Sequence, residues 1–185
     1  MARDQDKQLI EQLEQRLGEP VSTVRKTVLA VSRIPYGRQQ VPTPVGVIRE
    51  WRGTCSSKHL LLAALITERW PDVNPVIWHR VYKVTPELAM ERWGPSVPAS
   101  VPPGGLVDVH TYAVLSCQGS DVRVDVTFPL ADWDGVSDIA LACGDGYDVA
   151  GGADPLAVKT ELVASNCDVN IREPFIAALA EADEG

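Results

Sequence analysis

The stretch that most constrains the fold is "RGTCSSKHLLLAAL", residues 52–65, in which a cysteine directly precedes a long apolar run. Residues 60–66 are apolar on every side of a helix, and such a helix is stable only when other elements surround it. Thr54 is of a type that caps helix N-termini, so the helix is expected to begin at Cys55. The sequence therefore predicts a central buried helix with a thiol at its N-terminus.

Other helices are expected near both ends of the chain. Leu9, Leu13 and Leu17 recur at helical spacing, and Gly18 then ends a predicted helix over 3–17. The prolines and glycines of residues 35–46 predict irregular structure. Further helices are predicted over 21–34, over 86–93 beginning at Pro86, and over 173–182 with Phe175, Ile176 and Leu179 facing inward.

Strands are predicted over 74–84, 109–115, 122–128 and 157–163. Residues 94–108 form a long proline- and glycine-rich loop, and the Asp- and Gly-rich residues 129–154 are expected to be mostly loop. The 185 residues contain no repeat or linker, which favours one domain. We predict an α+β fold with N-terminal helices in 1–34, a core in 35–129, and loops, a last strand and a C-terminal helix in 130–185.

Composition excludes several classes of partner. The net charge is -8 and no run of Lys or Arg forms a basic stripe, which disfavours nucleic acid and anionic membrane surfaces. The first residues lack the apolar core of a signal peptide, and no apolar run approaches the roughly 18 residues of a membrane span. A cytoplasmic location is therefore expected.

The cysteines do not have the spacing of a disulfide framework or a zinc site. Cys55, Cys117, Cys143 and Cys167 are far apart and form no CxxC pair, so most are expected to be reduced and buried. The acidic stretches "DWDGVSD" and "GDGYD" lack the ligand spacing and terminal Glu of a calcium-binding loop. We predict no metal and no cofactor, with a metal protein kept as an alternative.

A thiol becomes a good nucleophile when a helix N-terminus and an imidazole lower its pKa. Cys55 has the first of these, and the chain has three histidines. His59, four residues later on the same helix, is expected to serve local packing, and His79 has no acidic neighbour in sequence. His110 begins a strand that leads through a short turn to Asp125 on the next strand. His110 is therefore the predicted partner of Cys55, and a buried, inert cysteine is the alternative.

The register of this hairpin decides whether His110 and Asp125 can meet. If residues 116–119 form a four-residue loop, Leu115 pairs with Ser120 and His110 lies opposite Asp125. Opposed residues have Cβ atoms about 5 Å apart, within reach of a hydrogen bond between their side chains. A loop one residue longer or shorter would put the two side chains on opposite faces. The alternative is an exposed charged face that carries an incidental histidine.

Three segments together resemble the transglutaminase-like superfamily. These are "GTCSSKHLLLAAL" with Cys55, "DVHTYAVL" with His110 and "VRVDVTFP" with Asp125, and "PYGR" before the cysteine adds to the likeness. The resemblance spans roughly residues 35–129 and implies a papain-like core with a Cys-His-Asp triad. Ser57 and Lys58 stand where many relatives carry an acidic or small residue, so substrate preference is not carried over.

The resemblance implies acyl transfer through a thioester. Cys55 would attack an amide or activated acyl carbonyl, His110 would move the proton, and Asp125 would orient the imidazole. The partners would be a small-molecule or peptide acyl donor and an acceptor that is water or an amine. Further expected contacts are the backbone N–H of Cys55 and the hydroxyl of Tyr36 as oxyanion donors, with Arg38, Arg49 and Trp51 lining the cleft.

A non-catalytic binding module on the same fold is the other alternative, because a fold does not fix a function. The sequence leaves the substrate, the acceptor and the oligomeric state open.

Overall fold

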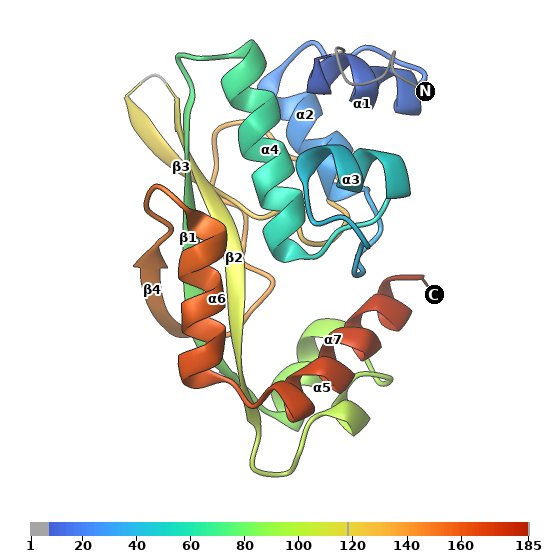
Figure 1. Ribbon diagram of the computed structural model, residues 1–185, viewed down its shortest axis with the longest axis vertical. Coiled ribbons are helices and arrows are strands. Elements are labelled where there is room, and N and C mark those ends of the chain that lie inside the picture. The colour runs from blue at the N-terminus through green and yellow to red at the C-terminus, as the bar shows by residue number, and fades with distance from the viewer. Residues whose placement is uncertain (1–7, 118, 185) are drawn as a thin grey trace.

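A four-stranded antiparallel sheet in the order β3-β2-β1-β4 lies at the middle of the structure (Figure 1). The computed structural model describes residues 8–117 and 119–184. The strands are β1 (Asn74–Val84), β2 (Leu106–Cys117), β3 (Ser120–Val124) and β4 (Gly146–Ala150). The helices are α1 (Leu9–Leu17), α2 (Val24–Ser32), α3 (Pro44–Glu50), α4 (Cys55–Arg69), α5 (Pro86–Trp93), α6 (Pro155–Asn166) and α7 (Val169–Glu184), with a 3-10 turn η1 (Pro98–Ser100). The α+β class is the one that the sequence predicts.

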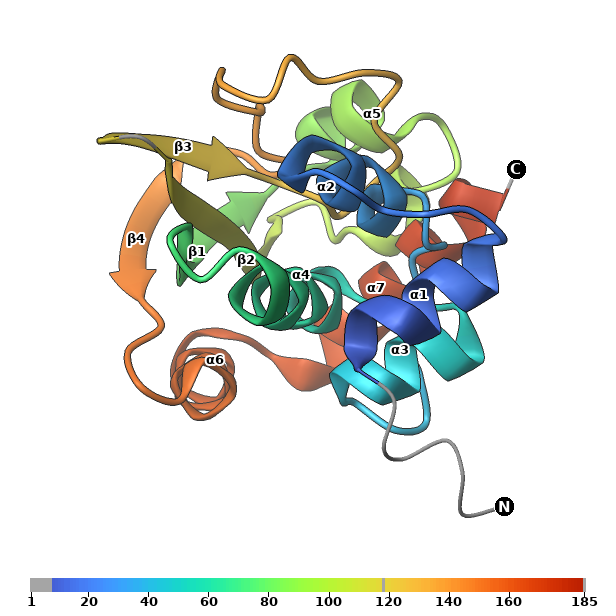
Figure 2. The same ribbon diagram turned by 90° about the horizontal axis from the view of Figure 1, so that it is seen from above.

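Helix α4 is the central helix, as the apolar run predicts. It packs against β1 and β2, and α6 lies on the same side of the sheet (Figure 2). Helices α1, α2 and α3 gather around α4 on its side away from the strands (Figures 1 and 2). The side chains of Leu61, Leu62, Leu65 and Ile66 are fully buried there. Each such side chain stabilises the fold by about 1.5–3 kcal/mol, so α4 organises the larger of the two apolar clusters.

A second apolar cluster fills the other end of the molecule, where α5, η1 and α7 meet the ends of β1 and β2 (Figure 1). Phe175, Ile176 and Leu179 are buried in it, which confirms the inward face predicted for the C-terminal helix. That helix is longer than the predicted 173–182 and contains Pro174. Residues 94–108 were expected to be one loop, but they contain η1 and the first three residues of β2, so the connection ends at residue 105. Val97 and Val101 of this connection are buried in the same cluster.

Two predictions fail because a helix start was not recognised. Residues 157–163 were expected as a strand but lie in α6, and α3 begins inside residues 35–46, which were expected to be irregular. In α6 the Asp154 side chain accepts a hydrogen bond from the N–H of Ala157. In α3 the Thr43 side chain accepts one from Gly46. Both helices have proline at their first position, directly after the capping residue. A capping residue followed by proline favours the start of a helix, even where the next residues have a preference for β-strands.

Strand β4 lies within residues 129–154, which were expected to be mostly loop. It pairs antiparallel with β1, and Arg80 of β1 makes two hydrogen bonds of 2.7 Å to the Asp148 carboxylate across the pair. Its side chains are largely exposed, so it lacks the alternation of apolar and polar residues that reveals a half-buried strand.

The β2–β3 hairpin has a shorter loop than predicted. Cys117 pairs with Ser120 and Ser116 with Asp121, so the register is shifted by two residues from the four-residue loop. A shift of two keeps every side chain on its predicted face, whereas a shift of one would have reversed them. The ladder ends where Val124 pairs with Ala113, so β3 stops short of the predicted residue 128 and leaves the first half of β2 unpaired on that edge.

The N-terminal helices are confirmed with shorter bounds. Gly18 ends α1 in the left-handed conformation, with φ of 75°, as the sequence predicts. Residues 3–7 of the predicted first helix lie outside the described residues. The second helix occupies Val24–Ser32 of the predicted 21–34, and the Thr23 side chain accepts a hydrogen bond from the N–H of Lys26 at its start.

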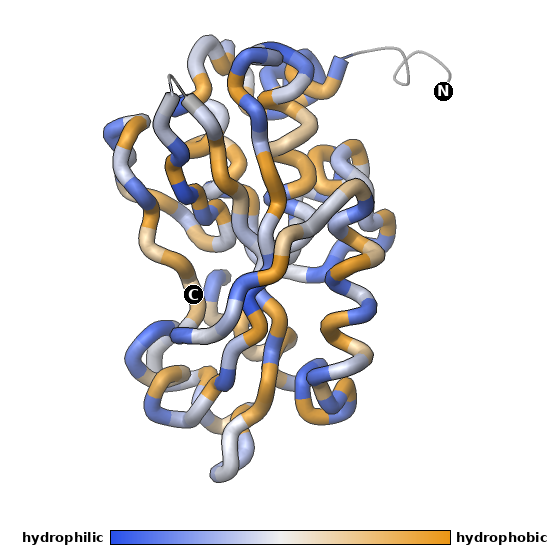
Figure 3. The backbone as a smooth tube through the Cα atoms, turned by 90° about the vertical axis from the view of Figure 1, so that its left-hand side faces the viewer, coloured by the Kyte–Doolittle hydropathy of each residue, from blue (hydrophilic) through white to orange (hydrophobic). Residues whose placement is uncertain are grey.

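Hydrophobic residues along the chain come in short runs broken by hydrophilic ones (Figure 3). Within residues 8–117 and 119–184, no helix has the length and apolar character that crossing a membrane requires.

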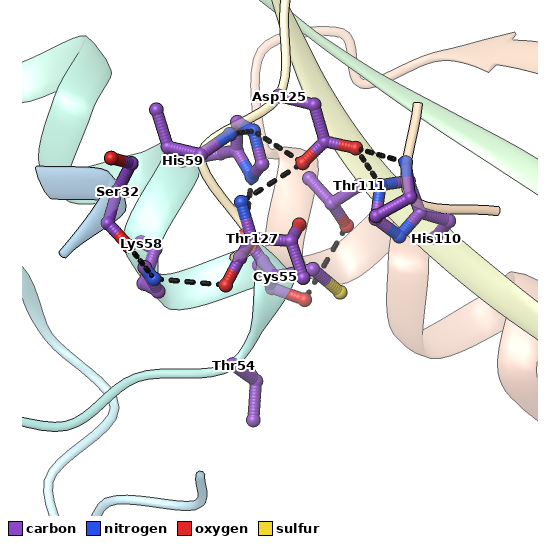
Figure 4. Close-up of polar contacts among 12 residues, drawn as sticks. Ser32, Thr54, Cys55, Lys58, His59, His110, Thr111, Asp125 and Thr127 are labelled. Atoms are coloured by element: carbon purple, nitrogen blue, oxygen red, sulfur yellow. Dashed lines mark hydrogen bonds and ion pairs between the residues drawn. The ribbon is translucent and has the colours of Figure 1, made fainter. Parts of the chain in front are cut away.

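Lys58 of α4 is fully buried, and its ammonium links α4 to two backbone segments, residues 32–34 and the stretch that contains Thr127 (Figure 4). Its Nζ donates hydrogen bonds to the carbonyl oxygens of Ser32 at 2.9 Å, Ile34 at 2.5 Å and Thr127 at 2.9 Å. Burial lowers the pKa of Lys58 to about 7, while the charges of Asp183 and Asp125 act to raise it. An ammonium has three N–H groups, so the charged form satisfies all three carbonyls at once.

We expect Lys58→Met to lower the free energy of unfolding by about 2–4 kcal/mol, because three buried carbonyl oxygens lose a charged donor. Urea unfolding at pH 6 measures this, with the exposed Lys83→Met as a matched control that stays within about 0.5 kcal/mol of wild type. An Lys58→Met protein as stable as wild type would show that the cost of burying the ammonium outweighs its hydrogen bonds.

Candidate active site

Cys55 lies at the first position of α4, with only 5% of its surface exposed. Thr54 is the N-cap residue, as predicted, but its side chain makes no capping hydrogen bond. The chain before it is held by a short parallel bridge between Tyr36 and Gly53, in which Gly37 N–H donates to the Gly53 carbonyl at 3.2 Å. A Cβ at Gly53 would stand 2.8 Å from Cγ of Lys58, so glycine permits this close approach to α4.

His110 and Asp125 are in direct contact (Figure 4). Asp125 Oδ2 accepts a hydrogen bond from His110 Nε2 at 2.7 Å and another from the N–H of Ala142 at 2.8 Å. Asp125 Oδ1 accepts from the N–H of Thr127 at 2.9 Å. The two side chains meet, as expected from the sequence, but they do not oppose each other in a ladder as predicted, because β3 ends at Val124. Asp125 instead reaches His110 beside the unpaired edge of β2.

The charges around Cys55 and His110 favour an ionised thiolate on Cys55 and a protonated imidazolium on His110. Burial raises the pKa of the Cys55 thiol, but the charge of Lys159 and a hydrogen bond with His110 outweigh burial and lower that pKa to about 5. Burial lowers the pKa of His110, but the charge and hydrogen bond of Asp125 raise it well above its ordinary value. Because Nε2 of His110 is engaged by Asp125, Nδ1 is the ring nitrogen left for the sulfur. His110 and Asp125 thus hold a proton next to an ionised Cys55.

Asp125 stays ionised although it is buried. Burial raises its pKa, but the charge and hydrogen bond of His110 and the hydrogen bond from Ala142 together hold it well below the ordinary range. A carboxylate held in this way orients the imidazole and supports its positive charge.

His59 contacts backbone groups through both ring nitrogens, which fits the local packing role expected from the sequence. Its Nδ1 donates to the carbonyl oxygen of Cys55 at 2.6 Å, and its Nε2 accepts from the N–H of Val126 at 3.0 Å. Both ring nitrogens are therefore used, and burial lowers the pKa of His59 to about 4. The unfolded chain binds this proton near pH 6.5, so His59 favours unfolding as the pH falls from about 6.5 to 4. His59 also ties the first turn of α4 to the segment that carries Asp125.

His79 is also engaged through both nitrogens. Its Nε2 donates to the carbonyl oxygen of Pro155 at 2.8 Å, and its Nδ1 lies 3.1 Å from Thr111 Oγ1. Burial and the charge of Lys159 lower the pKa of His79 to about 4, which leaves it neutral. The structural interpretation of His79 made from the sequence fits these contacts.

Lys159 of α6 is a residue of this site that sequence reasoning missed. Its Nζ lies 3.1 Å from Cys55 Sγ and 3.0 Å from Thr111 Oγ1, and only 7% of the residue is exposed. Residues 157–163 were expected to form a strand, so the side chain of Lys159 was not expected near Cys55. Once the segment is a helix, the lysine falls one turn after Pro155, on the face toward the sheet. The Asp-Pro start of α6 is the signal that could have found it.

The other predicted site residues are dispersed. Tyr36 is buried, and burial followed by the charge of Cys55 raises the pKa of its hydroxyl, so it remains an O–H donor near the thiolate. Arg38 binds both carboxylate oxygens of Glu173, at 2.5 and 2.6 Å. Trp51 packs on the larger apolar cluster, with the Arg16 guanidinium 5.4 Å from its ring centre.

A small pocket of about 150 Å³ adjoins the first turn of α4. Arg38 lines it, whereas Arg49 lines a larger hollow of about 700 Å³ that α3 forms with Gln12 of α1, away from Cys55. The residues that line the small pocket are Arg38, Gln39, Pro42, Thr54, Ser56, Ser57, Leu60 and Leu156. Cys55 itself is not among these lining residues.

Among the described side chains, Cys55, Cys143 and Cys167 are free thiols. No group of three or more His, Cys, Asp or Glu in the described part of the chain could hold a metal ion. Comparisons with protein-family models, with curated proteins and with solved structures each gave no match.

Iodoacetamide is expected to alkylate Cys55 before the other cysteines. Burial raises the pKa values of Cys143 and Cys167, whereas that of Cys55 is lowered to about 5. The labelling rate should inflect near pH 5 and stay flat between about pH 6.5 and 8, where a model thiol with pKa of about 8.5 would still be rising. Peptide mapping by mass spectrometry measures this, and Cys55→Ser is the control. Equal labelling of all four cysteines, or labelling of Cys55 last, would contradict an activated thiol.

Proposed function

We propose that the protein is a cysteine-dependent acyl-transfer enzyme that works through a thioester on Cys55. The observation that carries the proposal is the chain of contacts from the Cys55 thiolate to His110 and from His110 Nε2 to Asp125 at 2.7 Å. A lowered thiol pKa, a charged imidazole and a buried carboxylate in line are the requirements of nucleophilic thiol catalysis. The donor would be an amide or an activated acyl compound, and the acceptor water or an amine.

The chemistry would follow from the resting charges. The Cys55 thiolate attacks the acyl carbonyl, a C–S bond forms, and the carbonyl π electrons move to its oxygen. His110 is already protonated, so it acts as general acid and gives its Nδ1 proton to the leaving group as the tetrahedral intermediate collapses to the thioester. The now neutral His110 takes a proton from water or an amine as that acceptor attacks the thioester. Asp125 keeps the imidazole oriented through both steps.

Two donors could serve the oxyanion in this scheme. The N–H of Cys55 belongs to the first turn of α4, where no Thr54 side-chain cap competes for the backbone N–H groups. The Tyr36 hydroxyl keeps its proton and is close enough to feel the charge of Cys55. The short bridge between Tyr36 and Gly53 holds Tyr36 beside the chain that leads into Cys55, two residues after Gly53.

We also propose that the fold is a papain-like core of the transglutaminase-like superfamily. Support comes from a cysteine at the start of a central helix, packed on an antiparallel sheet with His110 on a following strand and Asp125 directly after the next. The chain order Cys, His, Asp is the order in that superfamily.

Trapping of an acyl-enzyme tests the proposal directly. Brief mixing with a panel of p-nitrophenyl esters and glutamine or glycine peptide amides, followed by acid quenching and intact-mass spectrometry, should show one acyl group on Cys55 that hydroxylamine removes. Cys55→Ser should show no hydroxylamine-labile adduct. A protein that gains no acyl group from any donor, while iodoacetamide still labels Cys55, would favour the non-catalytic binding module.

Turnover of any donor found in this way should depend on His110 and Asp125 but not on His59 as a base. His110→Ala and Asp125→Asn are each expected to lose about 10²–10⁴-fold in kcat, the range that general acid–base catalysis supplies. His59→Gln should instead lower the melting temperature, with kcat per folded molecule near wild type. If His59→Gln were inactive and His110→Ala active, the assigned roles of these two histidines would be wrong.

A further inference from the structure

The ammonium of Lys159 makes a contact with the Cys55 sulfur that the proposed triad does not use. Its Nζ lies 3.1 Å from Sγ, a hydrogen-bond distance to sulfur. Lys159 comes from α6, more than a hundred residues after Cys55, yet its side chain is nearly as buried as the thiol itself. A buried cation in contact with a nucleophile needs an explanation, because burying a charge without a partner is costly.

We infer that Lys159 is a further catalytic residue, whose ammonium pairs with the Cys55 thiolate at rest and with the oxyanion formed when that thiolate attacks an acyl carbonyl. The first half of this inference concerns only the protein, and the second half rests on the proposed function.

A relay of hydrogen bonds fixes Lys159 in this position. Nζ donates to Thr111 Oγ1 at 3.0 Å, and the Thr111 hydroxyl is then free to donate to Nδ1 of His79 at 3.1 Å. His79 Nε2 donates to the carbonyl oxygen of Pro155 at 2.8 Å. Pro155 is one turn before Lys159 on α6, so the relay closes on the same helix. Strands β1 and β2 thereby set the distance between the lysine and α4.

The charges around Lys159 leave the Cys55 thiolate as its closest anion. Thr111 and the neutral His79 supply no charge, and His110 is itself a cation. Asp108 feels the charge of Lys159, but its Oδ1 accepts a hydrogen bond from Arg172 Nε at 2.6 Å. The titratable groups that interact with the lysine are Cys55 from α4, His79 from β1, Asp108 from β2 and Cys167 at the end of α6, with His110 beside the same sulfur.

Lys159 and His110 would therefore divide two tasks. Imidazole exchanges protons near neutral pH, which suits His110 to carry the proton. An ammonium is a compact point charge with three donors, which suits Lys159 to hold negative charge in place. Two N–H groups of Lys159 meet Sγ and Thr111 Oγ1, and a third remains. When Sγ becomes bonded to the acyl carbon, the charge moves to an oxygen on that same carbon, within reach of the same ammonium.

The positive charge also protects the thioester from its neighbour. A neutral lysine beside a thioester would capture the acyl group as an amide and end turnover. An ammonium has no free electron pair, so it stabilises the oxyanion without competing with water or an external amine.

Alkylation across pH tests the thiolate pairing without any acyl donor. In Lys159→Met we expect the apparent pKa of Cys55 alkylation to rise by about 1–3 units, the effect of losing an adjacent opposite charge. The rate ratio of anionic iodoacetate to neutral iodoacetamide should fall in the same variant, because the cation that attracts the anionic reagent is gone. Lys159→Arg should keep both properties near wild type.

Two further variants keep this test decisive. Lys159→Gln retains an N–H donor without charge, so it should behave like Lys159→Met and serves if the methionine variant does not fold. The exposed Lys83→Met controls for the loss of one positive charge and should match wild type. If both uncharged variants of Lys159 alkylate with the wild-type pKa and reagent ratio, the pairing is overturned.

The oxyanion role is measured at pH 9.5, where Cys55 is mostly ionised in every variant. Lys159→Met should then acylate about 10-fold or more slowly, in the range of a lost oxyanion donor, with KM little changed. An unchanged acylation rate with a shifted alkylation pKa would overturn the oxyanion half alone. If no donor acylates wild type but the alkylation pKa still shifts in Lys159→Met, the pairing stands and the proposed function fails.

Discussion

The buried ammonium of Lys58 is the interaction on which the geometry of the site depends. Its three carbonyl partners lie at the end of α2, just before Tyr36, and just after Asp125. Lys58 itself is three residues after Cys55 on α4. One side chain therefore holds the segments that carry Cys55, Tyr36 and Asp125 at fixed separations. The lysine of "SSK" therefore has a structural role in this contact.

The three histidines show how partners decide the role of one residue type. His59 and His79 each use both ring nitrogens on backbone or hydroxyl groups, and burial lowers both pKa values to about 4. His110 is as buried as they are, but its direct partner is a carboxylate, so its pKa rises. A carboxylate compensates the desolvation of an imidazolium, whereas a carbonyl or hydroxyl group does so only in part. His59 and His79 are therefore neutral and hold neighbouring segments together, whereas His110 keeps its proton beside Cys55.

The segment between β3 and α6 contributes to the site through its backbone. Ala142 donates its N–H to Asp125 Oδ2 and Ile139 donates to the carbonyl of Arg123, so a region with little periodicity orients the carboxylate. Trp133 anchors this segment in the larger apolar cluster. Nearly every residue type has a backbone N–H group, so hydrogen bonds of this kind cannot be predicted from the identity of the residues.

The sequence by itself determined the elements whose signals are local. The apolar run after Thr54 specified α4 and the position of Cys55 at its start, and Pro86 and Gly18 marked helix ends where the structure has them. Alternating valines gave the buried face of β3 even though the predicted loop length was wrong, and His110 and Asp125 meet just beyond the end of that strand. Side chains along a strand alternate between its two faces, so a register shift of two residues leaves each side chain on the same face. An alternating sequence pattern can therefore predict the face without predicting the register.

Only the tertiary structure decided which charges surround the thiol. Lys159 lies 104 residues after Cys55, on a helix whose apolar residues are half exposed, so neither spacing nor periodicity indicates it. The position of Trp51 was also decided only by the tertiary structure. Its backbone is left-handed, with φ of 50°, and its ring lies against Arg16 and the apolar core instead of lining a cleft at Cys55. The sequence patterns that predict helices and strands depend on residues that are close along the chain. The partners of a buried charged side chain are residues that packing brings within a few ångströms of it, and these neighbours exist only in the folded molecule.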